Sequence, residues 1–332
     1  MSDAQAGLVD DAVAEDRSGW RPRRRGRMWR RRLGIGVLVF LVAVTAVSLV
    51  LNLVTQPPPR IEPGFGHYVQ VGSSKVHYQR WGERGTPIVL VPGFLESSIV
   101  WSAVGPLLGE HHRVYAVDLP GHGYTRYAGA MTLSGQTQLV EGFIKAVGLH
   151  PPLLVGHSLG AAVVGSLALR HPGDVGGIVF ADGDGLPINA GPSWLRVALL
   201  DSPYATTVLR VAAHWTWAAR QLITASCGSA CPGVTDAVAQ QWIRPLRQQS
   251  DQRTLVDLML NADYGLSGKQ IAAISVPASI IWGSHDQRGG SLPATITNLH
   301  HPPVRIIKDA GHLPMLANPS AFTRAVEAAA LQ

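Results

Sequence analysis

Most of the chain alternates between short apolar runs and longer stretches in which apolar residues recur every three or four positions. The short runs predict buried strands, and the longer stretches predict helices that pack against them. The predicted strands are Ile88–Val91, Val114–Val117, Leu153–Val155, Gly177–Ala181, Ala278–Trp282 and Val304–Ile307. The predicted helices lie near Ser98–Leu108, Ser134–Val147, Ser158–His171, Leu292–Leu299 and Ser320–Leu331. This order predicts an α/β fold whose mainly parallel sheet is covered by helices on both faces.

Two segments depart from the alternation. His67–Val71 and Val76–Trp81 alternate between apolar and polar residues and are joined by Gly72-Ser73-Ser74, which predicts an antiparallel hairpin. From Gly183 to about Lys269 the pattern contains no strand, only apparent helices rich in Trp, Leu and Ala. Because a compact domain rarely leaves so long a segment without structure, we expect a helical insertion over residues 183–269.

An uncharged run of 22 residues, 33–54, stands apart near the N-terminus. As a helix with a rise of ~1.5 Å per residue it would be roughly 33 Å long, enough to cross the hydrocarbon core of a bilayer. Eight arginines between Arg21 and Arg32 precede the run. They favour a cytoplasmic N-terminus and a globular part outside the cytoplasm. We therefore expect a single-pass anchor in the cell membrane.

A cleaved signal peptide, which would leave a secreted protein, is the alternative. The apolar region of a signal peptide is usually ~7–15 residues long and ends at small residues. Val44-Thr45-Ala46 matches such a site weakly, but the apolar run continues well past it. The length of the run therefore favours the retained anchor.

The charge balance changes the interpretation only at the N-terminus. Residues 1–32 hold nine arginines and five acidic residues, so most of the net charge of +6 belongs to the topology signal. The remainder has no basic stripe that would indicate nucleic acid. The predicted domains are a basic tail (1–32), a transmembrane anchor (33–54), a Pro-rich linker (55–65), an α/β core (66–182 and 270–332) and a helical insertion (183–269).

The candidate chemistry lies at the ends of predicted strands. Gly156-His157-Ser158-Leu159-Gly160 joins a strand to a helix, and a serine at such a turn is held on a strained backbone with its hydroxyl exposed. This serine can act as a nucleophile if a histidine base and a carboxylate lie nearby. Asp286 and His312 each follow a predicted strand, where the active sites of open α/β sheets lie. We expect Ser158, Asp286 and His312 to form a catalytic triad.

The chain order Ser158, Asp286, His312 resembles that of the α/β-hydrolase superfamily. Val89–Phe94 is similar to the strand and oxyanion turn of that fold, and Asp118–Gly123 is similar to its D-x-P-G-x-G turn. The resemblance covers about residues 66–331. One departure is that Pro92-Gly93 stands where many relatives have His-Gly, which leaves open how this turn is braced.

The resemblance implies further roles. The backbone N–H groups of Phe94 and Leu159 would form the oxyanion hole. Asp182 and Asp184 lie where some relatives keep the triad acid, so they are the alternatives to Asp286. His122 and His157 match structural positions of the fold, and Asp309 is expected to serve a turn.

The resemblance also implies that residues 183–269 form a cap over the substrate pocket. The cap contains four tryptophans, Trp194, Trp215, Trp217 and Trp242. Ordinary packing against the core explains any one of them, but together they favour an apolar acyl or alkyl substrate group.

The two cysteines, Cys227 and Cys231, could close a small disulfide loop, which agrees with a location outside the cytoplasm. Two free, buried thiols are the alternative. The sequence contains no cluster with metal-ligand spacing, no G-x-G-x-x-G and no P-loop, so we expect neither a metal nor a cofactor.

The leading hypothesis is a membrane-anchored serine hydrolase that cleaves carboxylic esters through an acyl-enzyme, with a small-molecule or lipid ester of apolar acyl character as substrate. The same triad would serve a C–C bond hydrolase, an acyltransferase or a haloperoxidase-like perhydrolase. A ligand-binding homologue without turnover is the alternative from a different class.

Overall fold

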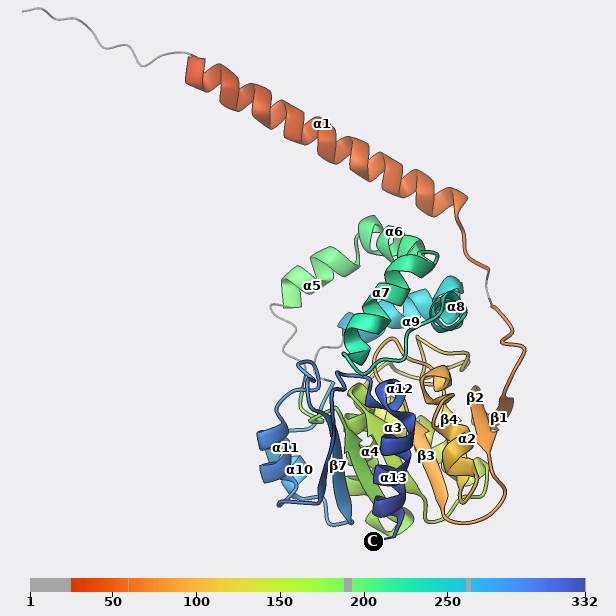
Figure 1. Ribbon diagram of the computed structural model, residues 1–332. Coiled ribbons are helices and arrows are strands. Elements are labelled where there is room, and N and C mark those ends of the chain that lie inside the picture. Colours follow the sequence, from red (N-terminus) through yellow and green to blue (C-terminus); the bar gives the residue numbers. More distant parts are fainter. Residues whose placement is uncertain (1–24, 59, 188–192, 261–263, 332) are drawn as a thin grey trace, which may run out of the picture. The chain divides into compact units, whose positions relative to one another are not determined.

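The computed structural model describes residues 25–58, 60–187, 193–260 and 264–331 (Figure 1). The chain forms two compact units, residues 1–47 and 48–332. The helix α1 (Arg25–Val54) contains a segment, Met28–Val54, that could cross a membrane by its length and composition. A signal sequence near the N-terminus would pass the same test. Residues 1–24 of the predicted basic tail (1–32) lie outside the described residues.

Within the described residues, the strands of the second unit form one eight-stranded sheet in the order β1-β2-β4-β3-β5-β6-β7-β8. Their bounds are β1 (His67–Val71), β2 (Ser74–Trp81), β3 (Pro87–Val91), β4 (Arg113–Val117), β5 (Leu153–His157), β6 (Gly177–Ala181), β7 (Ala278–Gly283) and β8 (Val304–Ile307). The β1–β2 hairpin and the β2–β4 pair are antiparallel, and the five other pairs are parallel. The predicted α/β class with a mainly parallel sheet is confirmed.

Helices pack on both faces of the sheet (Figure 1). These helices are α2 (Gly105–Gly109), α3 (Leu133–Ala146), α4 (Leu159–Arg170), α10 (Gly268–Ala272), α11 (Leu292–Asn298), α12 (Pro314–Ala317) and α13 (Pro319–Ala330). Val89 and Val91 of β3 belong to the same buried cluster as residues of α3 and α4. Ile88 and Leu90 belong to the other cluster, with residues of α2 and α13. Because successive side chains of a strand point to opposite faces, a strand covered on both sides is apolar throughout.

The single helix expected over Ser98–Leu108 is divided in two. Ser98–Trp101 forms a 3-10 turn, and α2 begins at Gly105 with Pro106 in its first turn. Proline has no N–H to continue a helix that enters from the preceding residues, but it fits the start of a new one. The prediction of one continuous helix was therefore wrong at this point.

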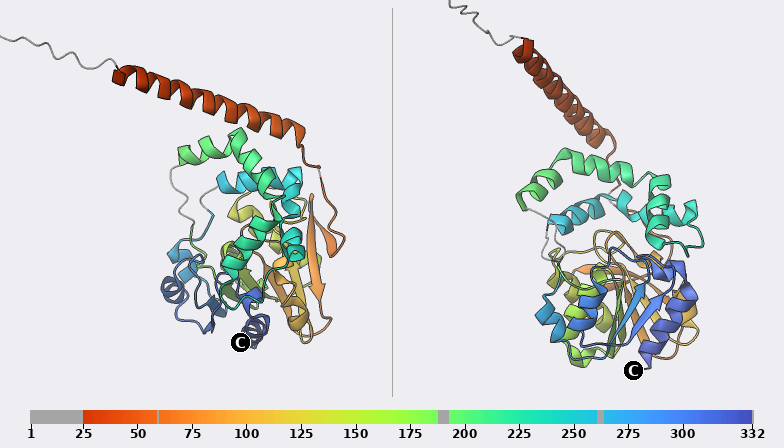
Figure 2. Two further views of the ribbon diagram at one scale, coloured as in Figure 1. Left: turned by 45° about the horizontal axis from the view of Figure 1, so that its top comes forward. Right: turned by 60° about the vertical axis from the view of Figure 1, so that its left-hand side comes forward.

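The helical insertion, by which we mean the described residues 193–260, follows β6 and precedes β7 in the sequence. It comprises α5 (Ser193–Leu200), α6 (Pro203–Ala212), α7 (Thr216–Cys227), α8 (Asp236–Ile243), a 3-10 turn (Pro245–Arg247) and α9 (Gln249–Leu260). These helices gather over one end of the sheet in both views of Figure 2. That end carries the carboxyl termini of the parallel strands, because Trp242 of α8 donates its indole N–H to Leu95 O, just beyond β3.

Truncation of a core side chain should measure how much this packing stabilises the fold. Phe180 of β6 is fully buried, so Phe180→Ala should lower the free energy of unfolding by about 3–5 kcal/mol. The control Ile306→Ala, on the exposed side of β8, should change it by no more than about 0.5 kcal/mol. Denaturant unfolding of the full chain in detergent would check this. Equal effects of the two variants would contradict the packing described.

Candidate active site

Ser158 lies on a sharp turn between β5 and α4. Its backbone has φ 50° and ψ −118°, a conformation that residues other than glycine rarely adopt. The Ser158 amide donates to Ala181 O at 2.9 Å, which ties the turn to the end of β6. Gly93 packs so closely on the other side that a Cβ there would lie 2.9 Å from Ser158 Cβ. These neighbouring segments of the same chain therefore hold the serine in its strained conformation.

The Ser158 hydroxyl lies beside His312. The distance from His312 Nε2 to Ser158 Oγ is 3.0 Å, and the distance from His312 Nδ1 to Asp286 Oδ1 is also 3.0 Å. Because a carboxylate only accepts, Nδ1 carries the proton that is donated to Asp286. Nε2 is then free to accept the proton of the Ser158 hydroxyl. The structure brings together the three residues for which the sequence predicts a triad.

The Asp286 carboxylate is buried and fully supplied with donors. Besides His312 it accepts the Arg288 amide N–H at 2.8 Å and the Gly289 amide N–H at 3.0 Å. Burial alone would raise its pKa, but the hydrogen bond and the charge of His312, together with the Arg288 amide, outweigh this and lower the pKa. Asp286 is therefore ionised at neutral pH, as an acceptor for the imidazole must be.

The two alternative acids have other partners. Asp182 accepts the Gly283 amide N–H at 2.8 Å, and burial together with the neighbouring Asp286 carboxylate raises its pKa well above the ordinary value. Asp182 therefore binds a proton more readily than Asp286 does. Asp184 accepts the Leu186 and Ser291 amides. Neither residue replaces Asp286 as the partner of His312.

Two backbone N–H groups beside Ser158 are available to an oxyanion. The amides of Phe94 and Leu159 donate to no acceptor among the residues that the structure describes. Leu159 is the first residue of α4, where an amide has no partner within the helix and the positive end of the helix dipole favours an anion. These are the two donors that the resemblance implied.

A carboxylate braces the oxyanion turn at the place where the sequence departs from its relatives. Glu96 Oε2 accepts the Gly93 amide N–H at 2.7 Å and lies 2.7 Å from His157 Nδ1. The other ring nitrogen of His157 lies 2.7 Å from His312 O. Both nitrogens face acceptor oxygens, so each must donate, and His157 is an imidazolium paired with the Glu96 carboxylate.

The electrostatics of this buried pair agree with its hydrogen bonds. Burial opposes the charge on both groups, but the Glu96 carboxylate raises the pKa of His157 to about 9. The His157 charge lowers the pKa of Glu96 in turn. Glu96 is not among the residues predicted from the sequence, although a carboxylate three residues after Gly93, in an otherwise apolar turn, is the signal that could have found it.

Two further histidines, His122 and His77, make hydrogen bonds that hold loops near the site. His122 donates to Glu96 O, and burial lowers its pKa, so it stays neutral. His77 pairs with Asp118 at 2.8 Å. Asp118 also accepts the Ser98 and Tyr124 amides, which folds the predicted D-x-P-G-x-G turn. These contacts agree with the expectation of structural roles for the turn and for His122.

A pocket of about 220 Å³ opens at Ser158. It is lined by Ser158, Leu159, Ala162, Gly183, Asp184, Gly185, Leu186, Pro187, Tyr264, Arg288, Gly289 and Gly290. The four predicted pocket tryptophans are absent from this lining: Trp194, Trp215 and Trp217 are exposed, and Trp242 is buried against Leu95 O. Among the described residues, apolar contact in the pocket comes instead from α4, from the segment after β6 and from Tyr264.

Cys227 and Cys231 form a disulfide at the end of α7. The loop that they close lies against the segment before His312, because Gly311 donates its amide N–H to Cys227 O at 2.8 Å and Ala230 donates to Asp309 O at 3.0 Å. The disulfide loop therefore helps to position the histidine.

One group among the described residues has the composition of a metal site. Glu141, His171 and Asp174 place ligand atoms within 4.8 Å of one another. They are partly exposed, and Glu141 already pairs with Lys145 and His171. Asp174 precedes β6, at the opposite end of the sheet from Ser158. Metal chemistry at this group would therefore not reach the serine.

Removal of the Glu96 charge should destabilise the protein in a pH-dependent way. Since folding raises the pKa of His157 to about 9, the stability from the pair is complete below its ordinary pKa of about 6.5 and is lost as the pH rises through about 9. Glu96→Gln should therefore lower the free energy of unfolding by about 3–5 kcal/mol near pH 6.5, and by much less above about pH 9.

Unfolding curves of the full chain in detergent between about pH 6 and about pH 10 would measure this difference. The control is Glu83→Gln, which removes an exposed partner of Arg80 and should cost at most about 1 kcal/mol at any pH in the range. A Glu96→Gln effect that is constant with pH would contradict the ion pair.

Comparison with known proteins agrees with this geometry. The profile of the Alpha/beta hydrolase family matches residues 88–325. The pimeloyl-[acyl-carrier protein] methyl ester esterase of Pectobacterium carotovorum subsp. carotovorum (strain PC1) is 27% identical in an alignment of 265 residues that covers 76% of this chain and 96% of the esterase.

Solved structures share the fold. A serine hydrolase involved in carbazole degradation has a TM-score of 0.66 at 22% identity, covering 81% of this chain and 99% of its own. A thermophilic esterase from Thermogutta terrifontis has a TM-score of 0.65 at 20% identity, and the match covers 80% of this chain and 97% of the esterase chain. Because the family profile spans well over half of the sequence, the chain belongs to the alpha/beta hydrolase family, and its homologues include esterases.

Proposed function

We propose that this protein is a membrane-anchored serine hydrolase that cleaves carboxylic esters with Ser158, His312 and Asp286. The observation that carries the proposal is the pair of 3.0 Å contacts that His312 makes, one with the Ser158 hydroxyl and one with the Asp286 carboxylate. A hydroxyl, an imidazole and a carboxylate in this arrangement are the parts of a general-base-activated nucleophile.

The reaction follows from what each group can donate or accept. Ser158 Oγ attacks the ester carbonyl carbon while His312 Nε2 takes the hydroxyl proton, and Asp286 stabilises the imidazolium that forms. The negative charge that develops on the carbonyl oxygen accepts hydrogen bonds from the Phe94 and Leu159 amides. His312 then protonates the leaving alkoxide, and an acyl group remains on Ser158. Water, deprotonated by His312, attacks the acyl-enzyme, and His312 returns this proton to Ser158 Oγ as the carboxylic acid is released.

The pocket favours a small or narrow acyl group that is mainly apolar. Leu159, Ala162 and Leu186 supply apolar contact, while Arg288 and Asp184 add charges at the pocket. The relative from Pectobacterium is named as a methyl ester esterase, which supports carboxylic esters as the substrate class. C–C bond cleavage, acyl transfer and perhydrolysis would use the same three residues, so a substrate panel has to separate them.

The anchored state is supported by the N-terminal region. Met28–Val54 could span a bilayer, and the arginines that precede it favour a cytoplasmic N-terminus. The catalytic unit would then lie outside the cytoplasm, where the disulfide between Cys227 and Cys231 can persist.

Covalent labelling tests the nucleophile. The full chain in detergent should react with a fluorophosphonate to give one adduct by intact mass, because an activated serine attacks phosphorus as it attacks a carbonyl. Ser158→Ala should give no adduct, whereas the control Ser166→Ala, which changes a buried serine of α4, should still be labelled. An adduct on Ser158→Ala, or none on the folded wild type, would contradict the assignment.

The role of Asp286 can be separated from that of its neighbours. Asp286→Asn should lower kcat for a p-nitrophenyl ester by about 10⁴-fold, because an amide in this place favours the wrong imidazole tautomer. The control Asp309→Asn, in the turn before His312, should retain kcat. A full loss in Asp182→Asn together with an active Asp286→Asn would show that Asp182 is the acid.

A further inference from the structure

The helical insertion exposes an unusual number of large apolar side chains. Trp194 is 71% exposed, Val208 64% and Trp217 58%. We call the exposed apolar residues of α5 to α7 the outer face: Trp194, Leu195, Val197, Leu199, Tyr204, Val208, Val211, Trp215, Trp217 and Leu222. A soluble protein rarely leaves so many such side chains in water, so the outer face marks a surface with a partner.

Hydrogen bonds join this surface to residues 48–54, the part of α1 that belongs to the second unit. The Ser48 and Thr207 hydroxyls lie 2.5 Å apart, and Asn52 donates from Nδ2 to Pro203 O at 2.8 Å. Arg210 donates to Asn52 O. Ser48 and Asn52 belong to the last two turns of α1, while the other three residues belong to α6. Residues 48–54 and α6 therefore lie side by side within the second unit.

The composition of the outer face suits a lipid surface. Residues 193–223 contain three arginines and a single acidic residue, Asp201. Trp215 and Trp217 stack with ring centroids 6.1 Å apart. Tryptophan concentrates at the boundary between headgroups and acyl chains, and arginines next to apolar side chains favour anionic lipids. This combination favours a bilayer over a second protein.

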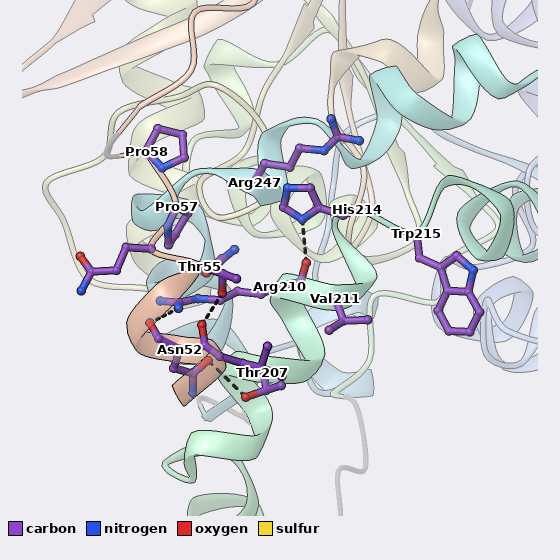
Figure 3. A pocket seen from close by; sticks show the side chains of 13 residues that line it. Asn52, Thr55, Pro57, Pro58, Thr207, Arg210, Val211, His214, Trp215 and Arg247 are labelled. Carbon is purple, nitrogen blue, oxygen red and sulfur yellow. Dashed lines mark hydrogen bonds between the residues drawn. The ribbon is translucent and has the colours of Figure 1, made fainter. Parts of the chain in front are cut away.

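A pocket of about 570 Å³ lies at the same junction. Figure 3 shows Asn52, Thr55, Arg210, His214, Trp215 and Arg247 around it. Leu51, Val211 and the two prolines at 57 and 58 add apolar walls. Arg210 Nε is buried and has no hydrogen-bond partner among the described residues. Two guanidinium groups in a largely apolar pocket fit a phosphate that carries an apolar tail.

We infer that the outer face docks on the bilayer that holds α1, and that the pocket binds the headgroup phosphate of an anionic phospholipid, with Arg210 and Arg247 as the cationic residues of its lining. This inference rests on the anchored state proposed above and not on the chemistry at Ser158. The insertion would thereby be a membrane-surface element, which explains why the tryptophans on it point away from the substrate pocket.

Footprinting of the full chain in nanodiscs tests the docking. Discs of phosphatidylcholine with phosphatidylglycerol, loaded at one chain per disc, would be exposed to hydroxyl radicals. Trp194, Val208 and Trp217 should lose most of their oxidation, while Ile306 on β8, which is also about half exposed, should be oxidised as in water. Oxidation of the outer face at the rate of Ile306 would overturn the inference. Protection that occurs only with two chains per disc would also overturn it, in favour of a dimer.

Native mass spectrometry of the protein released from the same discs tests the pocket. The wild type should retain a phosphatidylglycerol molecule, and Arg247→Gln or Arg210→Gln should reduce that fraction about tenfold, the factor expected for one charge-assisted contact. Arg305→Gln, which changes an exposed arginine of β8, is the matched control and should retain the lipid. Equal retention in all variants, or binding of inorganic phosphate without lipid, would overturn the assignment.

Fluorophosphonate labelling separates the possible failures. Labelling of each variant in detergent shows that it is folded and that Ser158 reacts. A chain that is labelled but does not enter discs would refute the anchor and with it this inference. A chain that enters discs with an unprotected outer face would refute the docking alone.

Discussion

The Glu96 carboxylate and the His157 imidazolium lie 2.7 Å apart beneath the nucleophile turn. Two buried charges are costly unless every donor and acceptor is satisfied. Here the remaining bonds go to the Gly93 amide and to the carbonyl of His312. The pair therefore joins the oxyanion turn, the turn of Ser158 and the loop of His312, which come from three different strands. A shift in any of these segments would leave a buried charge without a partner.

The strain at Ser158 depends on the same packing. A non-glycine residue at φ 50° persists only where its surroundings over-determine it. Gly93 on one side and Gly183 on the other approach so closely that a Cβ at Gly183 would lie 2.4 Å from Ser158 O. The glycines permit the close approach, and the ion pair keeps Gly93 in place. The geometry around the hydroxyl is thus built before any substrate arrives, which is what electrostatic preorganisation requires.

The apolar runs predicted the sheet well, and the ends of β6 and β8 coincide with the prediction. Ser158, Asp286 and His312 could be found because each follows such a run. Glu96 also follows such a run, but its role as an ion-pair partner could not be predicted, since His157 is 61 residues away and the burial of Glu96 depends on tertiary packing. The tryptophans were misleading because a short apolar helix does not reveal which side faces the sheet: Trp217 points outward, whereas Trp242 is buried.

In the proposed mechanism, the acyl group is transferred to Ser158 Oγ. Rapid-quench mass spectrometry during turnover of a p-nitrophenyl ester measures this directly, by the mass of the peptide that contains residue 158. This peptide should gain the mass of the acyl group within the burst phase and lose it as product forms. Turnover without an acylated peptide, or acylation at another residue, would contradict the proposed mechanism.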